Sequence, residues 1–93
     1  MNNQKRIDYS SDFDKQLRKA PLEIKIAFRK RFGLFLQNKF HPQLRNHELK
    51  GKHKDFRSIN ITGDWRAIYV ETEIEGDKII TFVLLGTHSQ LYK

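Results

Sequence analysis

An apolar run near the end of the chain, residues 79–85 with the sequence IITFVLL, limits the possible folds more than any other segment. The run is far too short to cross a bilayer as a helix. A strand with this sequence is apolar on both faces, so it has to lie centrally in a sheet or be covered by helices. The run therefore predicts a sheet against which the rest of a small chain packs.

The N-terminal part of the chain predicts a short strand at residues 6–9, followed by two helices. Three side chains that can accept the free N–H groups at the start of a helix come next: Ser10, Ser11 and Asp12. The first helix is expected to end near Ala20, because Pro21 cannot continue it. Pro21 can begin a second helix, which we expect to run to about Asn38.

The second predicted helix has an apolar face and a cationic face. Its apolar residues recur at helical spacing: Ile24, Ala27, Phe28, Phe32, Phe35 and Leu36. Such a stripe can line a ligand groove, but the periodicity is typical of a face buried in a core, which is our interpretation. Two helices joined this tightly are expected to form an antiparallel hairpin.

The remainder of the chain predicts a sheet. Strands are expected at residues 56–61, 65–70 and 79–85. The expected connections are an irregular polar segment over residues 39–54, a tight turn at 62–64 and a hairpin loop over 71–78. Gly86 is expected to end the last strand, which leaves residues 88–92 as a short turn or tail. This order favours an α+β fold, with a helical hairpin packed on a small, mainly antiparallel sheet in one domain of residues 1–93.

The charge of the chain favours a polyanionic partner. The net charge is +7, from 18 Lys and Arg against 11 Asp and Glu. Cations that neutralise phosphates release counterions, so nucleic acid fits this surface, although a strongly acidic protein also would. The absence of cysteine excludes disulfides and thiolate chemistry. No apolar segment follows the first residues as in a signal peptide, so we expect a cytoplasmic protein with no membrane partner.

The chain contains the residue types that cut RNA by attack of its own 2′-hydroxyl. This reaction needs a base, an acid and cations that hold the phosphate, and it requires no metal or cofactor. His47 and His88 supply imidazole rings, which can donate or accept protons, and Asp64 supplies a carboxylate in a turn. The four histidines lack the spacing and the adjoining carboxylates of a zinc site. The candidate catalytic residues are therefore His47, Asp64 and His88.

Other residues are candidates for binding RNA: Lys50, Lys52, Lys54, Arg57, Asn60, Trp65, Arg66 and Tyr92. Several of these candidates also have a purely structural interpretation. Asp64 can simply stabilise a turn, Trp65 can belong to the core, and Tyr92 can lie in a frayed tail. Arg57 shares a strand face with two isoleucines, so partial burial is open to it. The alternating lysines can be a solvated edge strand.

The ordered set of motifs resembles the RelE/ParE toxin superfamily and is most similar to its YafQ-type branch. The matching segments are His47-Glu48-Leu49-Lys50-Gly51, Phe56-Arg57, Asp64-Trp65-Arg66-Ala67-Ile68-Tyr69 and Gly86-Thr87-His88-Ser89-Gln90-Leu91-Tyr92. The resemblance covers nearly the whole chain. It implies a RelE-like fold and the toxin of a type II toxin–antitoxin pair, which enters the ribosomal A site and cuts mRNA there without a metal.

The resemblance also implies roles for individual residues. His47 matches a family active-site histidine, Asp64 an acidic position used as base or for orientation, and His88 the histidine proposed as general acid. Trp65 matches the tryptophan beside the acidic residue, and Tyr92 the C-terminal aromatic that helps to hold RNA. The two arginines that match recurrent family arginines, with a phosphate-binding or a structural use, are Arg57 and Arg66.

One position departs from the YafQ-type pattern, because Asn60 stands where that branch has a histidine. Asparagine can orient a substrate but cannot take a proton at neutral pH, so the role of base passes to His47 or Asp64. The implied partners are the ribosome, mRNA and a cognate antitoxin with an acidic or partly disordered segment. Two other functions stay open: a non-catalytic basic RNA-binding module, and a ParE-like toxin that acts on DNA gyrase.

Overall fold

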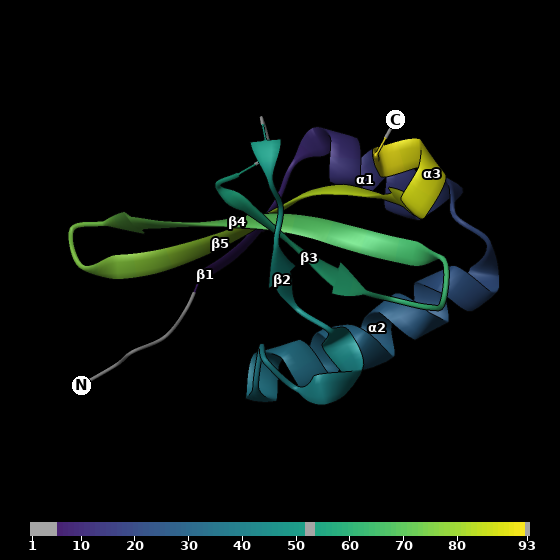
Figure 1. The fold of residues 1–93 in the computed structure, drawn as a ribbon, viewed down its shortest axis with the longest axis horizontal. Coiled ribbons are helices and arrows are strands. Elements are labelled where there is room, and N and C mark those ends of the chain that lie inside the picture. The colour runs from purple at the N-terminus through teal and green to yellow at the C-terminus, as the bar shows by residue number, and fades with distance from the viewer. Residues whose placement is uncertain (1–5, 52–53, 93) are drawn as a thin grey trace.

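The computed structural model describes residues 6–51 and 54–92. The strands are β1 (Arg6–Tyr9), β2 (His47–Glu48), β3 (Phe56–Asn60), β4 (Trp65–Ile74) and β5 (Asp77–Thr87). The helices are α1 (Ser11–Lys19), α2 (Leu22–Gln37), the 3₁₀ turn η1 (Pro42–Leu44) and α3 (His88–Leu91). Figure 1 shows α2 lying across one side of the sheet, with α1 and α3 gathered near one end of β5. The predicted α+β class is confirmed.

The strands form one mixed sheet in the order β1-β5-β4-β3-β2. β1 runs parallel to β5, and the other neighbouring pairs are antiparallel. The apolar run 79–85 lies in β5, between β1 and β4, so its predicted central place is correct. The sheet is mainly antiparallel, as expected.

The first helix is tied to the central strand by its cap. The Oγ of Ser10 accepts the backbone N–H of Phe13 at 3.0 Å, as expected of an N-cap residue. The same hydroxyl donates to the carbonyl oxygen of Val83 in β5 at 2.8 Å. One serine therefore starts α1 and also fixes it against the sheet.

Phe82 of β5 is the centre of an aromatic core. Its ring lies 5.4–5.8 Å from four other rings, those of Phe13, Phe28, Phe35 and Tyr69. The aromatic face of α2 is thus a core face, as predicted from its period. Leu36 was assigned to this face but is 58% exposed. It follows Phe35 by one residue, about 100° further round the helix, and so points away from the sheet.

The hairpin between β4 and β5 corrects the loop predicted at residues 71–78. β4 continues to Ile74 and β5 begins at Asp77, so only Glu75 and Gly76 form the turn. Both turn residues have positive φ, 52° and 87°, as in the tight turns that suit twisted hairpins. Figure 1 shows this hairpin projecting beyond the helices. The added strand residues are largely polar, and most of them are exposed.

Two further differences concern the segments that carry candidate residues. Gly86 does not end the last strand, because it pairs with Arg66 and β5 continues to Thr87. The segment 39–54, expected to be irregular, contains η1 and the short edge strand β2, which pairs with β3. In the described part of the chain, no helix is long and apolar enough to cross a membrane.

Candidate functional site

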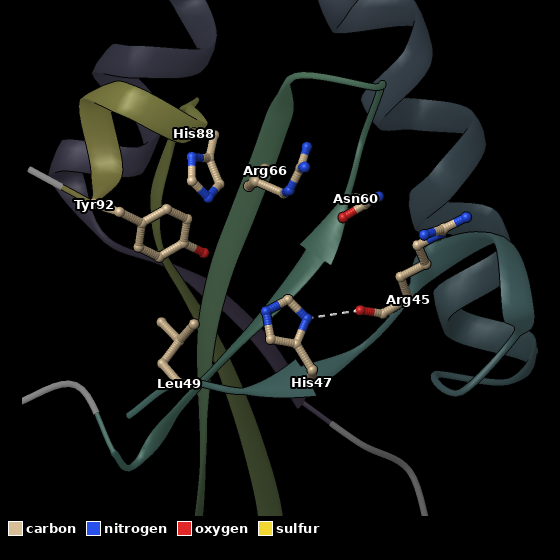
Figure 2. A pocket seen from close by; sticks show the side chains of 7 residues that line it. All are labelled: Arg45, His47, Leu49, Asn60, Arg66, His88 and Tyr92. Atoms are coloured by element: carbon tan, nitrogen blue, oxygen red, sulfur yellow. Dashed lines mark hydrogen bonds between the residues drawn. The ribbon is translucent and has the colours of Figure 1, made fainter. Parts of the chain in front are cut away.

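A hollow of about 430 Å³ lies at one end of the sheet, where β2, β3, β4 and the C-terminal segment meet. Its lining residues are Arg45, His47, Leu49, Asn60, Arg66, His88 and Tyr92. We call it the histidine hollow. Figure 2 shows His47 and His88 on opposite sides of it, with Tyr92 on a third side. The structure therefore brings together five of the predicted site residues, which come from β2, β3, β4 and the C-terminal α3 segment.

His47 begins the edge strand β2 and is exposed. Its Nδ1 lies 2.9 Å from the carbonyl oxygen of Arg45 (Figure 2). A carbonyl can only accept, so Nδ1 must carry the hydrogen of this bond. In the neutral ring the other nitrogen, Nε2, is then unprotonated and able to accept a proton.

The backbone of His88 is fixed by the cap of α3. Thr87 and Gln90 form a reciprocal capping box: the Thr87 N–H donates to Gln90 Oε1 at 2.9 Å, and the Gln90 N–H donates to Thr87 Oγ1 at 3.3 Å. The His88 N–H donates to the carbonyl oxygen of Asp64 at 2.9 Å. His88 is therefore held at a defined place although its ring is exposed.

Tyr92 supports the ring of His88 from one side. The two ring centroids are 4.6 Å apart. The hydroxyl of Tyr92 donates to Oγ of Ser58 at 3.0 Å, and Ser58 is fully buried in β3. A C-terminal aromatic residue is thus anchored to the middle of the sheet, so it is not a frayed tail.

Asp64 contributes to this arrangement through its backbone. Its carbonyl oxygen accepts from His88, and its N–H lies 3.4 Å from Thr62 Oγ1 within the β3–β4 turn. Among the described residues, those that line the histidine hollow do not include Asp64. The turn-forming role that the sequence left open is therefore present, while a catalytic role of its carboxylate stays a prediction.

Arg66 and Asn60 face each other across β3 and β4 and both line the histidine hollow. One nitrogen of Arg66, Nη1, donates to three carbonyl oxygens of the β3–β4 turn at 3.1–3.2 Å: those of Thr62, Gly63 and Trp65. All three acceptors are uncharged. They orient the guanidinium group without neutralising its charge, which remains available to an anion.

Arg57 lies away from the histidine hollow. Strand alternation puts it on the opposite face of β3 from Ser58 and Asn60. Its Nε donates to Oδ1 of Asn46 at 2.7 Å, and its guanidinium carbon is 5.3 Å from the centroid of the Phe40 ring. The observed contacts of Arg57 therefore agree with the structural role that the sequence left open.

Asn46 connects this network to the histidine hollow. Its Nδ2 donates to the hydroxyl oxygen of Tyr69 at 2.6 Å and to the carbonyl oxygen of Lys39 at 3.0 Å. Asn46 stands between Arg45 and His47 in the chain, so these bonds fix the backbone that presents both residues. The pKa of Tyr69 is raised, chiefly because burial disfavours its charged form, although the Asn46 hydrogen bond opposes this shift.

The other candidate RNA-binding residues that the structure describes lie outside the histidine hollow. Trp65 packs against the core and borders a separate hollow with Ala20 and Leu91, so its core interpretation holds. Lys50 and Lys54 are exposed beside the end of β2. Lys52 lies outside the described residues.

Arg45 was not predicted as a site residue, yet it lines the histidine hollow and its carbonyl oxygen accepts a hydrogen bond from His47. Arg45 has φ 48° and ψ 45°, a left-handed conformation that arginine rarely adopts. Leu49, which was also not predicted as a site residue, directly follows β2 and is buried. Among residues 6–51 and 54–92, no group of three or more His, Cys, Asp or Glu is placed to hold a metal ion.

Comparisons with known proteins agree on one group. The family model described as a bacterial toxin of type II toxin–antitoxin system, YafQ, matches residues 5–93. The crystal structure of YafQ from E. coli strain BL21(DE3) has a TM-score of 0.79 and 26% identity, covering 97% of this chain and 100% of that chain. The crystal structure of the E. coli DinJ–YafQ complex has a TM-score of 0.66 and 28% identity, covering 97% of this chain and 100% of that chain.

A more distant structure shares the fold alone. The YoeB/ParE toxin from Agrobacterium tumefaciens has a TM-score of 0.72 at 12% identity, covering 89% of this chain and 98% of that chain. Among curated protein sequences, none matches this chain significantly.

Proposed function

Because this chain belongs to the YafQ family of bacterial type II toxin–antitoxin toxins, we propose that it is a ribosome-dependent endoribonuclease that cuts mRNA in the A site. The observation that carries the proposal is the histidine hollow. Two histidines from separate elements line one open space, and Arg66 lies beside them. A base, an acid and a cation around one phosphate are what internal cleavage of RNA requires.

In the proposed reaction His47 is the general base. Its Nε2 accepts the proton of a ribose 2′-hydroxyl, and the 2′-oxygen attacks the adjoining phosphorus. The Nδ1 bond to the Arg45 carbonyl stabilises the protonated ring, because both nitrogens then carry hydrogen and the carbonyl remains an acceptor. His47 and not Asp64 is the better candidate, since it lines the histidine hollow.

His88 is the proposed general acid. The bond from phosphorus to the 5′-oxygen breaks, and His88 gives its proton to that oxygen, which leaves as a hydroxyl. The other product is a 2′,3′-cyclic phosphate. Arg66 and Asn60 bind the phosphate oxygens as charge accumulates on them, and Tyr92 orients the ring of His88. Both proton carriers are side chains, so the mechanism calls for no metal or cofactor.

A cognate antitoxin is the proposed protein partner. The E. coli YafQ was solved in complex with DinJ. The net charge of +7 suits an antitoxin segment that is acidic. Since the proposed substrate is mRNA on a translating ribosome, the proposed site of action is the cytoplasm.

Cleavage of mRNA on programmed ribosomes tests the proposal. We expect cuts with 2′,3′-cyclic or 3′-phosphate ends that require ribosomes, from the wild type and from His41→Asn. His41 is a matched control because it caps η1 outside the histidine hollow, and asparagine retains a cap. Intact mRNA with retained ribosome binding would instead favour the RNA-binding module. Inhibition of DNA gyrase without mRNA cleavage would favour the ParE-like alternative.

A further inference from the structure

A second hollow adjoins the histidine hollow on the side of α2. Its lining residues are Arg31, Gln43, Arg45, Asn60, Thr62, Gly63 and Arg66. Three of these, Arg45, Asn60 and Arg66, also line the histidine hollow. The two hollows therefore share a border formed by these three residues, so a ligand in one hollow that extends past this border reaches the other. We call the second space the arginine hollow.

The arginine hollow carries unbalanced positive charge. It contains three arginines, and no Asp or Glu is among its described lining residues. The ion pairs found within residues 6–51 and 54–92 involve none of these arginines. Like charges that converge without a carboxylate repel one another, so an anion placed between them is stabilised.

Uncharged groups hold two of these arginines in place. Arg31 reaches from α2 and donates through Nε to the carbonyl oxygen of Ile61 at 3.3 Å, and through Nη1 to Oε1 of Gln43 at 3.0 Å. Arg66 is oriented by the turn carbonyls described above. Preorganised guanidinium groups that retain their charge are suited to phosphate.

Arg45 links the two hollows. Its N–H donates to the carbonyl oxygen of Pro42, which helps to hold the left-handed backbone conformation. Figure 2 shows its carbonyl directed to His47 while the side chain extends away from that ring. Glycine would adopt this φ at little cost, so what arginine adds at this position is its side chain.

We infer that the arginine hollow binds the RNA phosphate next to the one that is cut. The inference rests on the proposed function, because it takes the phosphate between His47 and His88 as the reacting one. A strand that enters the histidine hollow meets Arg45 and Arg66 at its border and reaches Arg31 beyond them. The substrate is thus recognised as a polynucleotide, with at least two consecutive phosphates bound.

Two short RNA probes distinguish binding of one phosphate from binding of two consecutive phosphates. Both carry 2′-O-methyl groups, so neither can be cleaved: a dinucleotide with one bridging phosphate and a trinucleotide with two. Binding is followed by NMR titration of the whole protein at low ionic strength. For the wild type we expect the second phosphate to tighten binding roughly tenfold, the lower end for hydrogen bonds to charged groups. The dependence of log K on log salt should steepen by about 0.7 for the added phosphate.

Arg31→Gln and Arg45→Gln should each lose most of the gain in affinity that the second phosphate provides, while still binding the dinucleotide. Lys30→Gln and Arg29→Gln are the controls, because they remove the same charge from exposed positions of α2 outside the arginine hollow. Thermal unfolding checks that every variant is folded, and Arg45→Gly provides a second loss of the side chain without backbone strain. The controls should keep the full gain.

The inference is overturned if the wild type binds both probes equally, binds neither, or if the arginine variants gain as much as the controls. These results differ from failure of the proposed function. Cleavage by the wild type with an unaltered gain in the arginine variants leaves the nuclease and removes the second phosphate site. Loss of the gain in these variants without any cleavage leaves an anion site and removes the nuclease.

Discussion

The hydroxyl of Tyr92 donates to Oγ of Ser58 at 3.0 Å, and this bond joins the C-terminal segment to a fully buried position of β3. The same tyrosine ring lies 4.6 Å from the ring of His88. The position of the proposed acid therefore depends on a hydrogen bond made four residues further along the chain. Conditions or substitutions that break this bond should act on His88 before they affect the remainder of the fold.

Tyr92→Phe tests this dependence. It keeps the ring but leaves the buried hydroxyl of Ser58 without this partner, which should cost about 1 kcal/mol of unfolding free energy. Cleavage should slow by less than in Tyr92→Ala, which also removes the ring beside His88. Urea unfolding and single-turnover cleavage give the two quantities. Equal cleavage by all three proteins would show that Tyr92 does not position the acid.

Asn46→Ala should weaken the support of His47. The asparagine side chain bonds Arg57, Tyr69 and the Lys39 backbone, so its loss leaves partly buried polar groups unpaired. We expect a loss of about 2–3 kcal/mol of stability and slower cleavage. Urea unfolding and cleavage at a temperature where the variant is folded separate these effects. A stability loss with unchanged cleavage would exclude a positioning role for this network.

Gly86→Ala should displace α3. An added Cβ would lie 3.0 Å from Oε1 of Gln90 and 3.3 Å from Cδ2 of Leu91, so these side chains have to move, and Oε1 of Gln90 is the acceptor in the capping box that holds α3. We expect a clear fall in the cleavage rate and a smaller loss of stability, which the thermal midpoint measures.

Gly33→Ala is the matched control for this substitution, because its Cβ would meet no atom within 4 Å. Since Gly33 lies inside α2, alanine should raise stability by about 0.5–1 kcal/mol and leave cleavage unchanged. If Gly86→Ala cleaves as fast as Gly33→Ala, the position of α3 does not control cleavage.

Alkaline pH should destabilise the fold through Tyr69. Burial raises the pKa of Tyr69 above its ordinary value of 10.0. A group whose pKa is raised by folding contributes stability that is complete below the unfolded pKa and is lost as pH rises through the folded pKa. Unfolding free energy should therefore decrease above pH about 10.

Tyr9 contributes to the same alkaline loss, since its pKa is raised by burial and by Asp14. Urea unfolding between pH 9 and 11, in ~0.5-unit steps, should show a shallower decrease in Tyr9→Phe and a still shallower one in the double variant with Tyr69→Phe. A decrease of the same slope in all three proteins would contradict this assignment.

The hydrophobic pattern predicted the elements that bury apolar surface and missed those that do not. The central strand and the aromatic face of α2 follow from their periods, because burial decides both. The long β4–β5 hairpin was missed because its outer residues are polar, and strand pairing there is decided by the tight turn at Glu75 and Gly76.

The candidate site was predicted in part, mainly through the ordered motifs. His47, Asn60, Arg66, His88 and Tyr92 line one hollow because β2, β3, β4 and the C-terminal segment meet at one end of the sheet. Arg57 lies elsewhere because strand alternation turns it to the other face. Arg45 could not be found, because its place depends on a left-handed backbone that nothing about arginine indicates.

The most direct test of the central claim uses a substrate in which sulfur replaces the 5′-oxygen at the cleavage site. A thiolate leaves without a proton, so this RNA needs no general acid but still needs a base. On programmed ribosomes, His88→Ala should cleave the normal mRNA slowly and the sulfur-substituted mRNA at close to the wild-type rate. His47→Ala should be slow on both. If His88→Ala remains slow on the sulfur substrate, or cleaves the normal mRNA like the wild type, His88 is not the acid.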